Sequence, residues 1–131
     1  MKIISLKPDV FGAIASTLCY LHCLLTPIIF LSTSTNLNLY SSTPIWWNEL
    51  DFIFISISFF AIYKSNKTTS KKFMKYLLWF GWLLLFSLII NEKISLVSLP
   101  EYLKDISAIG LAVLHIYNLN YCQCKDDNCC A

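Results

Sequence analysis

Residues 9–27 read DVFGAIASTLCYLHCLLTP, and this stretch sets the architecture of the whole chain. Between Asp9 and Glu49 the sequence has no charged side chain, and up to Leu31 the polar groups are short hydroxyls, thiols and His22. A hydrocarbon core about 30 Å thick needs roughly 20 helical residues for each crossing. The stretch therefore predicts a first transmembrane helix that ends near Leu31.

The composition of the rest of the chain agrees with a membrane protein. Of 131 residues, 56% are hydrophobic and 14% are charged, and the mean hydropathy is +0.59. The net charge is only +2 and arginine is absent, which excludes a strongly basic nucleic-acid binder as well as a disordered chain. Four crossings would use about 80 residues. No room is then left for a second, soluble domain.

Three further apolar segments follow the first. The second begins at the Trp46-Trp47 pair, which suits an interfacial aromatic anchor, and the fourth is short. Glu49 and Asp51, near the start of the second segment, either line an entry route into the protein or lie at the membrane interface, and we favour the interface. The predicted fold is an all-α, four-helix transmembrane bundle forming one domain over residues 1–131, with helices over about residues 9–31, 45–63, 73–91 and 105–121 and a cysteine-rich tail over residues 122–131.

The lysines predict how the bundle is oriented. If the four helices alternate in direction, only Lys93 and Lys104 fall on one side of the membrane. The other side receives Lys2, Lys7, Lys64, Lys67, Lys71, Lys72, Lys75 and Lys125. By the positive-inside rule, both termini are cytoplasmic, and the chain is a multi-pass membrane protein.

One face of the first helix collects the small and polar side chains. At about 100° per residue, six of them fall on an arc about 80° wide: Asp9, Gly12, Ser16, Cys19, Cys23 and Pro27. Small residues let helices approach closely in lipid, and polar groups inside a membrane are candidates for a functional site. We expect this face to look into the bundle.

Cys19 and Cys23 are the candidate metal ligands on this face. Because they are four residues apart, both sulfurs can converge on one ion, and His22 can add a nitrogen. Two thiolates suit Hg(II) or Cu(I), whereas Zn(II) needs further ligands, which His22, His115 or an acidic group would supply. The alternative is that the cysteines only pack as small hydrophobic residues and that His22 only links helices.

The fourth helix carries a second polar stripe, formed by Leu114, His115, Asn118 and Cys122. We expect it to pack against the stripe of the first helix. For His115 and Asn118 we favour interhelical hydrogen bonds over a role in metal binding or relay.

The tail contains Cys122, Cys124, Cys129 and Cys130 within nine residues. In a reducing compartment structural disulfides are disfavoured, and the spacing does not fit a zinc ribbon. Two interpretations remain, namely a thiol cluster that accepts a soft metal ion and S-palmitoylation of juxtamembrane cysteines. We favour the metal.

The run D-x-x-G-x-x-x-S-x-x-C-x-x-H-C-x-x-x-P from Asp9 to Pro27, three further helices and the cysteine-rich end resemble the MerC family. The resemblance implies a small four-helix inner-membrane protein associated with mercuric-ion uptake. By position it makes Cys19 and Cys23 the membrane pair and draws a second pair from Cys122, Cys124, Cys129 and Cys130. Those family members place their membrane cysteines closer together with no histidine between, and they have one tail pair.

The first hypothesis for function is a transporter that passes Hg(II), or another soft ion such as copper or zinc, from the membrane cysteines to the tail. Its partners would be the lipid bilayer, the metal ion and a cytosolic thiol or mercuric reductase, with no nucleic acid. The alternatives are a membrane-embedded metal sensor or partner subunit without net transport, and a structural membrane protein with incidental cysteines. The sequence has no phosphate-binding loop and no hydrolase motif, so we expect neither an enzyme nor an ATP-driven pump.

Overall fold

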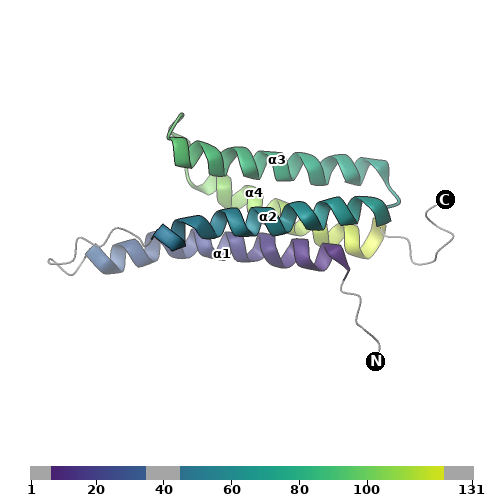
Figure 1. Ribbon diagram of the computed structural model, residues 1–131, viewed down its shortest axis with the longest axis horizontal. Coiled ribbons are helices and arrows are strands. Elements are labelled where there is room, and N and C mark those ends of the chain that lie inside the picture. The colour runs from purple at the N-terminus through teal and green to yellow at the C-terminus, as the bar shows by residue number, and fades with distance from the viewer. Residues whose placement is uncertain (1–6, 35–44, 123–131) are drawn as a thin grey trace, which may run out of the picture.

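The computed structural model describes residues 7–34 and 45–122 and shows an all-α bundle (Figure 1). Its four long helices are α1 (Pro8–Ser34), α2 (Ile45–Thr68), α3 (Lys72–Ile94) and α4 (Tyr102–Tyr117), and a π-helical turn, η1 (Asn118–Cys122), continues α4. α1 packs along both α2 and α4, and α3 packs mainly on α4. The four-helix architecture expected from the sequence is confirmed.

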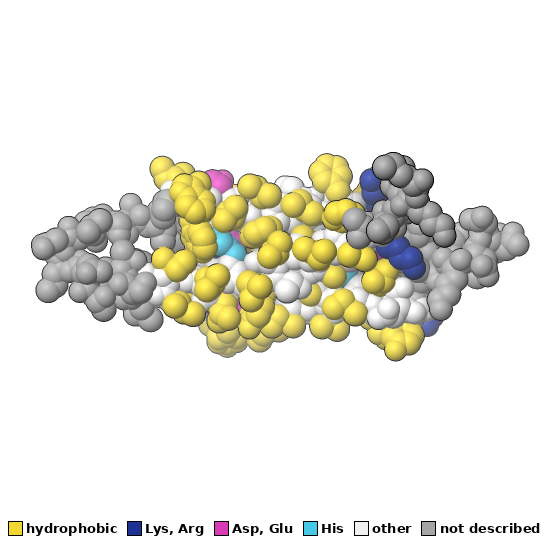
Figure 2. Space-filling view, turned by 90° about the horizontal axis from the view of Figure 1, so that it is seen from below, with side chains coloured by type: hydrophobic (Ala, Val, Ile, Leu, Met, Phe, Trp, Pro, Cys, Tyr) yellow, Lys and Arg dark blue, Asp and Glu magenta, His cyan; other side chains and the backbone are white. Residues whose placement is uncertain are grey.

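The helices alternate in direction, so the bundle has two distinct ends (Figure 1). The start of α1, the α2–α3 turn and the end of η1 lie together at one end, and lysine side chains gather there (Figure 2). We call this the lysine end. The start of α2 and the connection Ser95–Glu101 between α3 and α4 lie at the other, which we call the loop end.

Turn residues fix the connection at the loop end. Ser95 adopts a left-handed conformation (φ 54°) and its N–H donates to the Asn91 carbonyl, which ends α3. The Asn91 side chain then binds both backbone groups of Val97, at 2.8 and 3.0 Å. Pro100 lies just before α4, and its carbonyl accepts the N–H of Leu103. This short, closed loop holds the start of α4 beside the end of α3.

The distribution of polar and apolar groups is that of a membrane bundle. Large apolar side chains cover the outer surface, and they form a continuous band between the two ends (Figure 2). The interior holds buried polar groups, among them Asp9, Ser65, His115 and Asn118, none of which is exposed. α1, α2 and α3 are each long and apolar enough to cross a membrane.

α4 alone is 16 residues long, but η1 extends it without a break to Cys122. Tyr102 to Cys122 spans about 30 Å at 1.5 Å per residue, enough for one crossing. The largest difference from the expected bounds at a helix end is in α2, which continues past Tyr63 to Thr68, whereas α1 and α3 end three residues later than expected and α4 begins three residues earlier. Its polar last turns remain helical because Ser65 is turned inward and hydrogen-bonded to Asp9 on α1.

Candidate metal site

Cys19 and Cys23 lie on the inner face of α1, as the helical periodicity predicted. They are 2% and 8% exposed, and both are free thiols. Asp9, Gly12 and Ser16 are buried on the same face. The prediction for this face is thus confirmed from Asp9 to Cys23.

Pro27 is the exception on that face. The arc placed it inward, but it is exposed. Figure 1 shows the last turns of α1 projecting beyond the described ends of the neighbouring helices at the loop end.

Asp51, in the second turn of α2, completes a group of three candidate ligands. One of its carboxylate oxygens and the sulfurs of Cys19 and Cys23 all lie within 4.8 Å of one another. Asp51 is only 5% exposed, so its side chain faces the interior of the bundle. The carboxylate is inside because α2 packs this face along α1, where His22 receives it. Glu49, two residues earlier, is exposed.

A pattern in the sequence could have revealed the inward position of Asp51. Asp51, Ile55, Ser58, Ile62 and Ser65 follow each other at spacings of four and three residues, which is one face of a helix. All five are buried, with exposures of 0–5%. The two serines on an otherwise apolar face mark it as the side that looks into the bundle.

His22 contacts Asp51 rather than belonging to the three-ligand group. Its Nδ1 lies 3.0 Å from Oδ1 of Asp51, and the His22 side chain is 7% exposed. The ring packs against Trp47, with centroids 4.5 Å apart, and Trp47 donates a hydrogen bond to the Thr26 hydroxyl. These contacts fix the imidazole between α1 and the start of α2.

Lys104, in the first turns of α4, reaches the same carboxylate from the other side. Its Nζ lies 3.9 Å from Oδ2 of Asp51 and is hydrogen-bonded to the carboxylate of Glu92 on α3. The Lys104 side chain is 13% exposed and that of Glu92 is 53% exposed. The sequence alone predicts for Lys104 only a place just before the fourth helix, among the charges of a loop. The structure makes it the cation next to the thiol pair.

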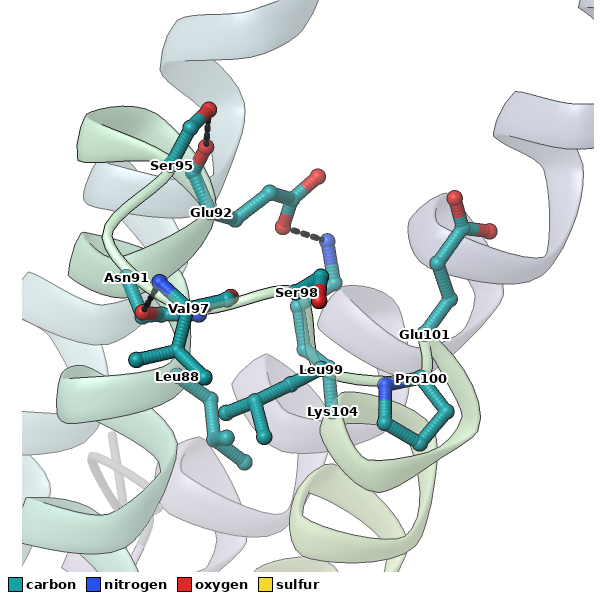
Figure 3. Close-up of a pocket in the computed structure, with 10 residues that line it drawn as sticks. All are labelled: Leu88, Asn91, Glu92, Ser95, Val97, Ser98, Leu99, Pro100, Glu101 and Lys104. Carbon is teal, nitrogen blue, oxygen red and sulfur yellow. Dashed lines mark hydrogen bonds and ion pairs between the residues drawn. The ribbon is translucent and has the colours of Figure 1, made fainter.

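A pocket at the loop end opens onto Lys104. Its volume is about 300 Å³, and the end of α3, the Ser95–Glu101 connection and the start of α4 form its walls. Figure 3 shows Lys104 extending from α4 to Glu92 across this pocket. Lys104 thus lines the pocket and also faces Asp51, whereas Asp51 and the two thiols are not part of the pocket wall.

A second polar cluster lies at the lysine end. His115 Nδ1 is 2.9 Å from Oδ1 of Asp9, and the Asn118 amide donates to Oδ2 of Asp9, also at 2.9 Å. Ser65 donates to both Asp9 oxygens, at 2.8 and 2.9 Å, and Thr69 lies 2.9 Å from the Asn118 amide. The cluster joins α1, α2 and α4. The expected interhelical hydrogen bonds of His115 and Asn118 are confirmed.

The tail cysteines fall almost entirely outside the described residues. Cys122 is the last residue of η1, at the lysine end. Cys124, Cys129 and Cys130 lie beyond it, where the structure describes nothing. Their role in metal binding remains a prediction from the sequence.

The thiol pair has the geometry of a site for a soft ion. A metal–sulfur bond of about 2.3 Å, as in zinc thiolates, places two sulfurs on opposite sides of an ion about 4.6 Å apart. The sulfurs of Cys19 and Cys23 lie no more than 4.8 Å apart, which is compatible with two bonds to one ion. Soft thiolates select soft ions over hard ones. The arrangement can therefore hold an ion that accepts two sulfur ligands.

Comparison with known proteins also points to a protein that handles a soft metal ion. No curated protein and no solved structure matches the chain. One family model does, that of the MerC mercury resistance protein, over residues 9–120. The match begins at Asp9, includes the thiol pair, His22, Asp51 and Lys104, and stops two residues before Cys122. Because it covers most of the chain, the protein is a member of the MerC mercury resistance family.

Proposed function

We propose that this protein carries Hg(II) across a membrane, with Cys19 and Cys23 as the ligands that capture the ion. The observation that carries the proposal is the pair of buried, free thiols, one helical turn apart on the inner face of a mercury-resistance family member. Thiols that served only for packing would have no need of a buried carboxylate from α2 within 4.8 Å.

The chemistry is thiolate exchange. Each thiol of the pair loses its proton to water as its sulfur bonds the ion, so Hg(II) becomes a neutral dithiolate complex. A third thiol then loses its proton and attacks, and the sulfur that leaves regains a proton. The ion is never bare in hydrocarbon, where an unpaired divalent cation would be prohibitively costly. No ATP is required if thiols on the far side drain the product.

The proposed route runs from the loop end to the lysine end. We place the lysine end in the cytoplasm of a bacterial inner membrane, by the positive-inside rule. An ion would come through the pocket beside Lys104, bind the thiol pair with His22 close by, and pass to the tail cysteines. A cytosolic thiol or a mercuric reductase would receive it there. The tail cysteines that would bind the ion are Cys122, Cys124, Cys129 and Cys130.

One observation favours the second candidate, a metal sensor or partner subunit without net transport. The buried cluster around Asp9 and His115 fills the bundle between the thiol pair and the lysine end, and its hydrogen bonds leave α1, α2 and α4 closed there. A sensor needs a bound ion but no open path. Under the transport proposal this cluster must open in each cycle.

Uptake of labelled Hg(II) distinguishes these functions. Bacteria without mercuric reductase would express the parent or the Cys19→Ser/Cys23→Ser variant at equal membrane levels. The proposal expects uptake above the vector control in the parent and none in the variant. Binding without uptake in the parent would support the sensor. Equal curves for vector, parent and variant would overturn mercury transport.

A matched control tests whether position matters beyond thiol number. Ser87 is exposed on the lipid side of α3 and bonds only its own helix, at the Leu83 carbonyl. Adding Leu83→Cys and Ser87→Cys to the Cys19→Ser/Cys23→Ser variant returns two thiols, four residues apart, to the exposed side of α3 instead of the inner face of α1. Uptake should stay at the vector level. Rescue by these two thiols would show that the inner face of α1 is not the site.

A further inference from the structure

The Asp51 carboxylate is close enough to the thiols to be a third ligand, yet both of its oxygens already face other groups. His22 Nδ1 lies 3.0 Å from Oδ1, and the Lys104 ammonium lies 3.9 Å from Oδ2. Asp51 and Lys104 have side-chain exposures of 7% and 13%, so water screens their attraction only weakly. Glu92 holds Lys104 from the pocket side.

The number of available ligands decides which soft ion a thiol pair prefers. Hg(II) and Cu(I) accept two-coordinate thiolate binding, whereas Zn(II), and by the same chemistry Cd(II), favours four ligands. A third ligand from Asp51 would thus strengthen the binding of Cd(II) and Zn(II) far more than that of Hg(II). An ion that binds Asp51 must compete with Lys104 and His22 for the charge and lone pairs of this carboxylate.

We infer that Lys104, with His22, withholds the Asp51 carboxylate from the metal and so keeps the Cys19–Cys23 pair a two-ligand site selective for Hg(II) over Cd(II) and Zn(II). This inference rests on the proposed function and names a residue that sets its specificity. Lys104 acts through Asp51 and touches no metal itself.

The test is metal binding by the full-length chain in detergent, with the four tail cysteines replaced by serine so that only the membrane pair binds. Cd(II) is followed by its sulfur charge-transfer absorption, and Hg(II) by competition against a soluble thiol. In Lys104→Gln the affinity for Cd(II) should rise about tenfold or more, and that for Hg(II) should stay within about threefold. An unchanged ratio of the two affinities would overturn the inference.

A double variant tests whether the effect runs through the carboxylate. In Lys104→Gln/Asp51→Asn the gain in Cd(II) affinity should disappear, because the freed ligand is gone. A gain that survives would mean that Lys104 acts by bulk charge, and the inference would be wrong. Lys93→Gln is the matched control, since it removes the same charge at the loop end from a lysine that lies over the Phe52 ring. It should leave the ratio at the parental value.

Asp51→Asn alone covers the case in which Lys104→Gln does not fold. If Asp51 is withheld in the parent, this variant should bind both ions within about threefold of the parental affinities. A tenfold loss of Hg(II) affinity would show that Asp51 is already a ligand and would overturn the inference. Failure of the parent itself to bind Hg(II) through the pair would instead overturn the proposed function.

Discussion

The imidazole of His115 on α4 lies against the backbone of Gly12 on α1, so closely that a Cβ at position 12 would stand 2.3 Å from Cε1 of that ring. The ring cannot retreat freely, because its Nδ1 is held at 2.9 Å by Asp9. Glycine at position 12 is thus what allows α1 and α4 to approach and lets the buried cluster at the lysine end form.

Gly12→Ala should destabilise the bundle by about 1–3 kcal/mol, because the added methyl group overlaps the His115 ring and must displace it from Asp9. Thermal unfolding in detergent measures the effect. The matched control is Gly110→Ala on α4, where a Cβ meets nothing within 4 Å. That variant should be neutral or slightly more stable, since alanine is the better helix former. Equal losses in both would contradict the role given to Gly12.

Ser65→Ala should cost about 1–2 kcal/mol, because the buried Asp9 carboxylate loses its hydroxyl donor on α2. Its control is Ser56→Ala. The Ser56 side chain is exposed, and among the described residues its hydroxyl donates to the Phe52 carbonyl of the same helix. Unfolding of the two variants under identical conditions gives the comparison. If Ser56→Ala cost as much as Ser65→Ala, the Asp9 cluster would contribute nothing particular to stability.

Single cysteines should report the orientation of the bundle. In a background without the native cysteines, Lys71→Cys lies at the lysine end and Ser98→Cys at the loop end, and both positions are exposed. A thiol reagent that cannot cross membranes should label Ser98→Cys in intact spheroplasts and Lys71→Cys only after lysis. The reverse pattern would place the lysine end outside the cell and would invert the proposed direction of transport.

Replacing Cys122, Cys124, Cys129 and Cys130 together by serine should separate capture from delivery. Binding of one Hg(II) per chain at the membrane pair should persist, since that pair lies on α1 and does not depend on the tail. Net uptake should fall several-fold because the ion has lost its next thiol acceptor. Stoichiometric titration and uptake of labelled ion check the two parts. Unchanged uptake would show that soluble thiols take the ion directly.

Periodicity predicted much of the bundle from the sequence. The inner face of α1 can be predicted from the sequence because the helix has no charged residue after Asp9. Its few polar groups are then easily recognised among apolar residues. The stripe of His115 and Asn118 was recoverable for the same reason. In both cases the signal lies within a single helix.

The rest of the site depends on contacts between helices, which periodicity does not contain. Asp51 lies 29 residues from His22 in sequence, and near the start of a membrane helix a carboxylate ordinarily faces the interface. The sequence predicts Lys104 in the loop before the fourth helix, whereas α4 begins two residues before it. Only the packing of α2 and α4 on α1 brings these charges to the thiols.

X-ray absorption at the mercury edge tests whether Cys19 and Cys23 bind Hg(II) as a site of two sulfur ligands. Full-length protein with its four tail cysteines replaced by serine would be loaded with one Hg(II) per chain. We predict that the bound Hg(II) has two sulfur ligands and no oxygen or nitrogen ligand. All binding should be lost in Cys19→Ser/Cys23→Ser. A stoichiometric Hg(II) site that survives that double substitution, or a parental site with an oxygen or nitrogen ligand, would contradict this prediction.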